Sequence, residues 1–126
     1  MKTLLITIAL LIPITAHGQL SNSKAQSYAN EVFEMASGYI EEYKYRDGGE
    51  FAIGYTSEHS NFSTLRSMIG LIATTNQNIE VVQSWTRKGD SYQYGVAIDR
   101  KYVMVVHYIP ESNGLIVGYV EAESNK

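Results

Sequence analysis

Histidine is the residue type of this chain best suited to metal binding and proton transfer, and it is scarce. Of the three histidines, His17 lies in an N-terminal leader segment, which leaves His59 and His107. A zinc site usually needs three or four protein ligands. The nearest carboxylates in the sequence are Glu58 and Glu111, and no H-x-x-x-H or H-x-H spacing is present. We therefore predict no metal site.

The tetrapeptide Ser57-Glu58-His59-Ser60 contains the three residue types of a nucleophilic triad. A triad works only when the base is oriented towards the nucleophile, and adjacency along one loop does not provide that orientation. The G-x-S-x-G spacing of a nucleophile elbow is absent from the sequence. The tetrapeptide is therefore interpreted as a polar turn.

Two carboxylate pairs have the residue types needed for glycoside hydrolysis. Glu41 and Glu42 lie near the end of a predicted helix, where adjacent residues face different directions. Glu121 and Glu123 lie near the C-terminus. Both pairs are interpreted as solvated charges, so we predict a protein that is not an enzyme and that binds no cofactor.

The charge balance argues against nucleic acid as a partner. The formal net charge is −3, and removing Lys2 with the leader gives −4. Nucleic-acid binders draw much of their affinity from lysines and arginines that neutralise phosphates. Here the close basic groups are Arg87-Lys88 and Arg100-Lys101, both in predicted hairpin turns. We expect neither nucleic acid nor an anionic membrane surface as a partner.

Residues 1–18 have the pattern of a cleavable signal peptide. Lys2 gives a positive start, residues 4–12 are apolar, and Pro13 precedes the small residues of Ala16-His17-Gly18. The apolar run is shorter than the roughly 20 residues of a membrane-spanning helix. We expect cleavage between Gly18 and Gln19, a secreted or periplasmic location, and no integral membrane segment in the mature chain.

The remaining residues 19–126 have the size of one compact domain. The chain has no cysteine, so neither disulfides nor a lipid-attachment cysteine contribute. Hydrophobic packing must therefore supply the stability, and 44% of all residues are apolar. We predict a single domain.

The first half of this domain combines helical and strand patterns. Apolar residues recur with a helical period over residues 23–45, with Ser23 and Gln26 at capping-box spacing and Gly48-Gly49 as a stop. A short strand is predicted over residues 51–56. A second helix is predicted over residues 61–74, with Ser60, Asn61 and Ser63 as candidate caps, and a strand over residues 68–73 is the alternative. Asn61 also begins an N-glycosylation sequon.

The second half reads as a meander of strands over residues 79–86, 91–98, 102–109 and 115–121, because the short connectors favour antiparallel neighbours. The last two strands are apolar on both faces, so something must cover the second face. The second helix, a partner chain or an apolar ligand are the alternatives.

These elements predict an α+β fold in the order α-β-α-β-β-β-β. A long N-terminal helix and a shorter second helix pack on a curved antiparallel sheet. This order resembles the topology of cystatin-like and NTF2-like proteins, in which a curved antiparallel sheet wraps a helix. The resemblance is one of topology and implies no function.

Tyrosine is the compositional outlier, with 10 copies against 3 phenylalanines and 1 tryptophan. Tyrosine is enriched at protein interfaces. We therefore expect an exported, non-catalytic binding module of the inhibitor, accessory or immunity type, which recognises another protein through a tyrosine-rich sheet face. The residues expected to contact that partner are Tyr92, Tyr94, Tyr102 and Tyr108, with Trp85 as an anchor.

Two alternatives remain open. One is a pocket between sheet and helix that binds a small apolar ligand and is lined by Met68, Met104 and Val117. The other is a homodimer formed through the uncovered sheet face, which would hide the same surface twice.

Overall fold

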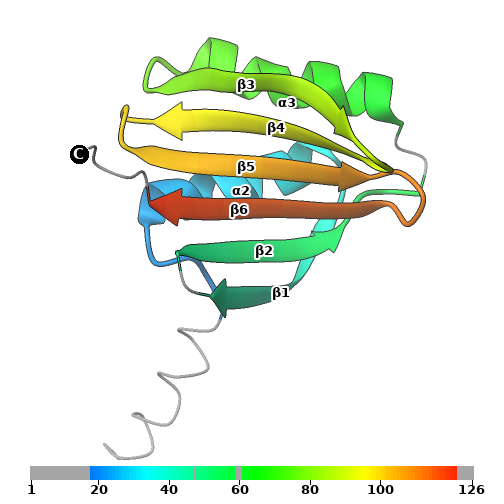
Figure 1. Cartoon of the computed structure of the whole chain (residues 1–126), viewed down its shortest axis with the longest axis horizontal. Helices are drawn as coiled ribbons and strands as arrows, with labels where there is room; N and C mark the ends of the chain where they lie inside the picture. Colours follow the sequence, from blue (N-terminus) through cyan, green and yellow to red (C-terminus); the bar gives the residue numbers. More distant parts are fainter. Residues whose placement is uncertain (1–17, 47, 59–60, 122–126) are drawn as a thin grey trace, which may run out of the picture.

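The computed structural model describes residues 18–46, 48–58 and 61–121 (Figure 1). Residues 1–17 of the predicted leader lie outside the described residues. The elements in chain order are α2 (Ser23–Met35), β1 (Tyr39–Arg46), β2 (Gly49–Tyr55), α3 (Phe62–Thr75), β3 (Ile79–Lys88), β4 (Ser91–Ile98), β5 (Tyr102–Ile109) and β6 (Gly114–Glu121).

The six strands form one antiparallel sheet in the order β1-β2-β6-β5-β4-β3. The predicted α+β class is confirmed, with two helices on an antiparallel sheet. The meander is confirmed as well, since β4 and β5 have the predicted bounds and β3 and β6 differ from them only at one end. The hairpin β1–β2 pairs with β6 and so extends the meander on its other side.

The prediction of one helix over residues 23–45 is wrong for residues 36–45, because α2 ends at Met35 and β1 follows. Ser37 adopts a left-handed backbone conformation with φ 55°. The amide of Gly38 donates to the carbonyl of Phe33 at 2.9 Å, and the amide of Ser37 donates to the carbonyl of Glu34 at 3.0 Å. These two bonds form a Schellman motif, which satisfies the last carbonyls of the helix and ends it.

Gly38 is required where the chain turns from α2 into β1. A Cβ atom at this position would overlap the backbone carbonyl oxygen of Tyr55. The glycine therefore lets β1 lie close to the end of β2, and the alternation of Tyr43, Lys44, Tyr45 and Arg46 becomes that of a strand.

Asparagines cap both helices. The Asn22 side chain accepts hydrogen bonds from the amides of Lys24 and Ala25, so Asn22 and not the expected Ser23 is the N-cap. The expected capping box of Ser23 and Gln26 is not formed, because the Gln26 side chain accepts from the amide of Leu20, which precedes the N-cap. Asn61 caps α3 as predicted, and its side chain accepts from the amide of Thr64 at 2.9 Å.

Both described helices lie on the same face of the sheet, behind it in the view of Figure 1. Of the three alternatives for covering the other face, the second helix is therefore excluded. The core fills the space between the helices and this covered face. Its largest fully buried side chains are those of Tyr108, Leu20, Leu65, Ile69, Ile72, Ile98, Met104, Leu115, Val32, Val96, Val106 and Val117.

Candidate functional site

The candidate site lies on the sheet face opposite the two helices, called the open face below. The strand register places alternate residues of β2, β6, β5 and β4 on this face. Most of these side chains are apolar and half-buried, which is the burial expected of a pleated surface that no described helix covers. The apolar and aromatic part of the open face includes Tyr39, Phe51, Ile53, Tyr55, Gly95, Ala97, Val103, Val105, His107, Ile109, Ile116, Gly118 and Val120. The same register adds polar residues at its edges, namely Ser91 and Gln93 of β4 and Glu42, Lys44 and Arg46 of β1.

Phe51 is the aromatic side chain that β2 contributes to the middle of its open side. Phe51 pairs with Gly118 of β6, and a Cβ atom at Gly118 would lie 2.6 Å and 2.7 Å from two atoms of the Phe51 ring. The glycine therefore lets the ring lie flat over the sheet. On the other side of Gly118 lies Val105 of β5, which continues the apolar surface across the sheet.

Two tyrosines extend the open face towards the end of β2. Tyr39 of β1 and Tyr55 of β2 are directly paired, and their ring centroids are 5.9 Å apart. Their exposed fractions are 58% and 37%. Large exposed rings of this kind are typical of protein-binding surfaces, because tyrosine offers a large contact area with few rotors to order.

A hollow of about 260 Å³ lies on the open face beside β1 and is called the basic hollow below. It is lined by Lys44, Arg46, Phe51, Ile53, His107 and Ile116. Lys44 is directly paired with Phe51, and Arg46 is two residues further along the same side of β1. The floor of the basic hollow is therefore apolar, and its rim on β1 is cationic.

His107 is the titratable group at the centre of the open face. It lies between Gln93 of β4 and Ile116 of β6 in the strand register. Burial lowers the pKa of His107, and the positive charge of Lys88 lowers it further. The imidazole is therefore neutral at neutral pH, with two ring nitrogens able to donate or accept a hydrogen bond.

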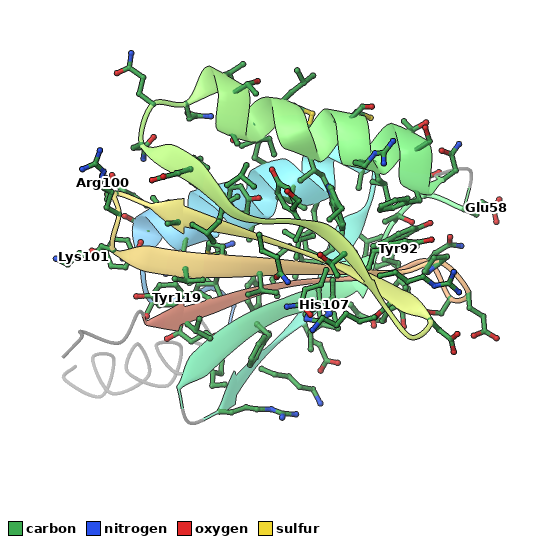
Figure 2. All side chains as sticks on the ribbon, turned by 45° about the horizontal axis from the view of Figure 1, so that its top comes forward. Glu58, Tyr92, Arg100, Lys101, His107 and Tyr119 are labelled. Atoms are coloured by element: carbon green, nitrogen blue, oxygen red, sulfur yellow. The ribbon has the colours of Figure 1, made fainter. Side chains whose placement is uncertain are left out.

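The tyrosines predicted to contact a partner share one face, as expected, but that face is the one the helices cover. Figure 2 shows Tyr92 on the α3 side of the sheet and His107 on the opposite side. Tyr94 and Tyr108 are only 4% and 2% exposed, and Tyr92 and Tyr102 pack against the core. In this chain these rings supply hydrophobic packing, so they do not form an accessible surface.

Aromatic stacking explains this placement. The Phe62 ring of α3 stacks on Tyr92 with a centroid distance of 3.8 Å, and Trp85 stacks on Tyr94 at 4.8 Å. Phe62 and Trp85 meet edge to face at 5.3 Å. The expected anchor Trp85 therefore joins β3 to α3 within the core.

Two of the three residues expected to line a ligand pocket, Met104 and Val117, belong to the core. Met104 and Val117 have no exposed surface, so neither borders a hollow that is open to solvent. Met68 is half-buried on α3. The structure thus places these three side chains in packed or partly packed positions on the covered side of the sheet.

The residues considered for catalysis are not brought together in the described part of the chain. His59, Ser60 and Glu123 lie outside the described residues, and Glu41 and Glu42 are exposed on β1. Within residues 18–46, 48–58 and 61–121, no group of three or more His, Cys, Asp or Glu side chains is arranged to hold a metal ion. Over the same ranges no helix is both long and apolar enough to cross a membrane.

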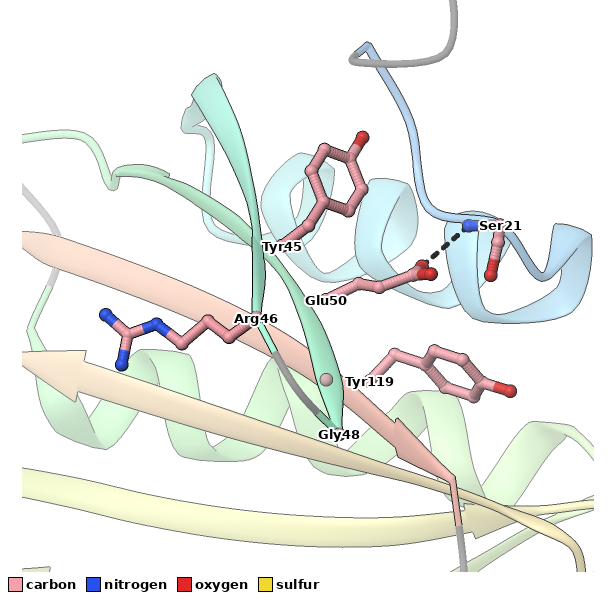
Figure 3. Close-up of a pocket in the computed structure, with 7 residues that line it drawn as sticks. Ser21, Tyr45, Arg46, Gly48, Glu50 and Tyr119 are labelled. Carbon is pink, nitrogen blue, oxygen red and sulfur yellow. Dashed lines mark hydrogen bonds between the residues drawn. The ribbon is translucent and has the colours of Figure 1, made fainter.

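A second hollow, of about 300 Å³, lies at the β1–β2 hairpin and is lined on one side by Ser21 from the start of the described chain (Figure 3). The hydroxyl of Tyr45 donates to the carbonyl of Gln19 at 2.6 Å, and the amide of Ser21 donates to the carboxylate of Glu50 at 2.7 Å. Arg46 extends away from these groups (Figure 3). This hollow therefore anchors the N-terminal segment.

The comparisons with known proteins do not identify this chain. Neither a protein-family model, nor a curated protein, nor a solved structure matches it.

Sequence reasoning missed Lys44, Arg46 and Phe51 as site residues. Residues 43–46 alternate between aromatic and basic side chains, and this alternation is typical of a strand. This alternation was assigned to the end of a helix, because the apolar residues also fitted a helical period.

Proposed function

We propose that this protein is an exported, non-catalytic binding protein that recognises another polypeptide through its open face. The observation that carries the proposal is the apolar character of a sheet face that lies opposite both described helices. A sheet with one face in water normally alternates between apolar and polar residues. Here β5 and β6 present apolar side chains on both faces, with valines and isoleucines on the open one.

The size of the open face suits a protein partner. Six strands about 4.8 Å apart and about eight residues long span roughly 600 Å² on one side. A stable interface of ordinary size buries about 800 Å² per partner, so the open face with its rim approaches that area. Contiguous apolar patches of a few hundred Å² typically mark sites of association.

The composition of the open face also fits this function. Tyr39 and Tyr55 provide exposed rings at one end, and Val103 and Val105 provide an aliphatic centre. Charged side chains stand at the edge and not in the middle, since Lys44 and Arg46 lie on the outermost strand β1. An apolar centre with a polar rim is the usual anatomy of a protein interface.

Photo-crosslinking in the native host tests this function. A photoreactive amino acid at Val105 should give a discrete adduct with a different polypeptide, whereas the same amino acid at the exposed Ser67 of α3 should not. Adding Val103→Glu to the protein that carries the photoreactive amino acid at position 105 should abolish the adduct, because this substitution places a charge beside the probe. The matched substitution Ser67→Glu in that background should leave it intact.

Two results would contradict the proposal. One is equal crosslinking from positions 105 and 67, which would mean that the open face has no special role. The other is an adduct that contains only a second copy of this chain, which would identify the open face as a homodimer interface.

A further inference from the structure

We infer that the basic hollow receives an acidic side chain of the partner, carried next to an apolar residue that lies on the floor formed by Phe51, Ile53 and Ile116. This inference rests on the proposed function and names the chemistry that the partner must present. The observation behind it is the combination of two cationic side chains and an apolar floor in one hollow of the open face.

The dimensions of the hollow fit this ligand. A hollow of about 260 Å³ is large enough for one or two side chains. Lys44 and Arg46 lie two residues apart on the same side of β1, so about 7 Å of strand separates them. A single carboxylate between them is within reach of both long side chains.

The charge of the hollow favours an anion. In the part of the chain that the structure describes, the one ion pair joins Lys24 to Asp99, which leaves Lys44 and Arg46 without a carboxylate partner there. Lys88 adds positive charge near His107. Glu42 is the one carboxylate on the same side of β1, where it is directly paired with Ile53.

The apolar floor distinguishes this ligand from a simple anion. Phosphate or sulfate would engage the two cations and leave Phe51, Ile53 and Ile116 in water. An acidic side chain flanked by leucine satisfies both halves of the hollow, since its neighbour covers the rings and branched aliphatics while the carboxylate meets Lys44 and Arg46. Arginine adds a bidentate geometry that matches a carboxylate.

A pair of peptides tests the inference on the mature chain, residues 19–126. The probes are acetyl-Leu-Glu-Leu-amide and acetyl-Leu-Gln-Leu-amide, which have nearly the same shape and differ in the carboxylate. Titration followed by two-dimensional ¹H–¹⁵N NMR should shift the amides of Lys44, Phe51 and His107 with both peptides. The Glu peptide should bind about three- to tenfold more tightly, as expected for ion pairs at a partly exposed site.

Charge variants locate the effect. The double substitution Lys44→Gln/Arg46→Gln should bring the affinity for the Glu peptide down to that for the Gln peptide. The matched control Arg100→Gln/Lys101→Gln removes the same charge from the β4–β5 turn, which Figure 2 shows away from His107 and which lies three strands from β1 in the sheet order, and should preserve the difference. Raising the salt concentration should also reduce the difference, because exposed ion pairs are screened.

Each remaining outcome has a defined meaning. If both peptides bind the open face equally, the acidic preference is wrong while the proposed function stands. If neither peptide shifts the amides of the hollow, or if inorganic phosphate alone reproduces the shifts of the Glu peptide, the inference is overturned. The crosslinking experiment at Val105 judges the proposed function separately, since it reports on the centre of the face and not on the hollow.

Discussion

The two faces of β5 should respond very differently to the same isosteric substitution. Val105 and Val106 are neighbours in the strand, but Val105 lies on the half-exposed open face and Val106 is fully buried beneath the helices. Replacing valine by threonine keeps the shape and the preference for strands and exchanges one methyl group for a hydroxyl. The pair Val105→Thr and Val106→Thr therefore isolates the environment of each face.

The expected magnitudes follow from where the hydroxyl lies. At position 106 the hydroxyl enters the apolar core among Val117, Tyr94 and their neighbours, and a buried hydroxyl without a partner costs about 1–3 kcal/mol. For a domain of this size that loss lowers Tm by about 4 to 18 °C. At position 105 the hydroxyl remains in contact with water, so the stability should change by no more than about 0.5 kcal/mol.

Urea unfolding of the purified mature chain measures both free energies, with circular dichroism as the signal and equal slopes as the check on two-state behaviour. The reasoning is refuted if Val105→Thr costs as much as Val106→Thr. That result would mean that both faces of the sheet are buried in the purified protein.

Four further predictions concern single positions. Leu20→Ala should lower the free energy of unfolding by about 2–5 kcal/mol in urea, because this side chain is 2% exposed and anchors the segment before α2. Gly54→Ala should destabilise the β1–β2 pairing, since the added Cβ overlaps a carbonyl oxygen of β1. In contrast, the Cβ added by Gly70→Ala in α3 meets nothing within 4 Å, so this variant should be more stable by about 0.5–1 kcal/mol. Thermal unfolding of the two variants measures both changes in stability. Tyr28→Phe removes a buried hydroxyl that has no partner among the described residues, so calorimetry should show a stability that is unchanged or higher. Burial and a nearby lysine lower the pKa of His107, so the unfolded chain takes up a proton at higher pH than the folded one and stability is lost as the pH falls below about 6.5. His107→Gln should flatten this part of the stability–pH curve. Parallel curves for the two proteins would contradict the assignment.

Regular periodicity and turn chemistry were enough to predict most of the fold. The bounds of β4 and β5 follow from alternating residues between glycine- and aspartate-containing turns, and the cap of α3, Asn61, is one of the three candidates that the sequence offers. These features are local, so a single sequence reveals them.

The segment after Met35 could not be assigned in this way. Tyr39, Ile40 and Tyr43 fit the helical period of the preceding residues, yet they form a strand. The decisive features are the left-handed turn at Ser37 and the close approach of Gly38 to β2, which is a tertiary contact. A contact between distant residues overrides the local preference here.

The site shows the same division. The excess of apolar residues in β5 and β6 predicted a second face in need of cover, but the pattern does not tell which of the two faces the helices take. Tyr94 and Tyr108 looked like surface residues because of their hydroxyls, whereas stacking against Trp85 and Phe62 brings this group of rings under α3. Which face of the sheet the helices cover depends on how whole helices and strands pack.

The accessibility of the valine methyl groups tests the central claim most directly. In a sample of the mature chain with ¹³C-labelled methyl groups, a soluble paramagnetic compound broadens the signals of methyl groups that water can reach. The methyl signals of Val103 and Val105 should broaden strongly, while those of Val106 and Val117 remain sharp. Equal protection of all four valines would contradict the existence of an open face.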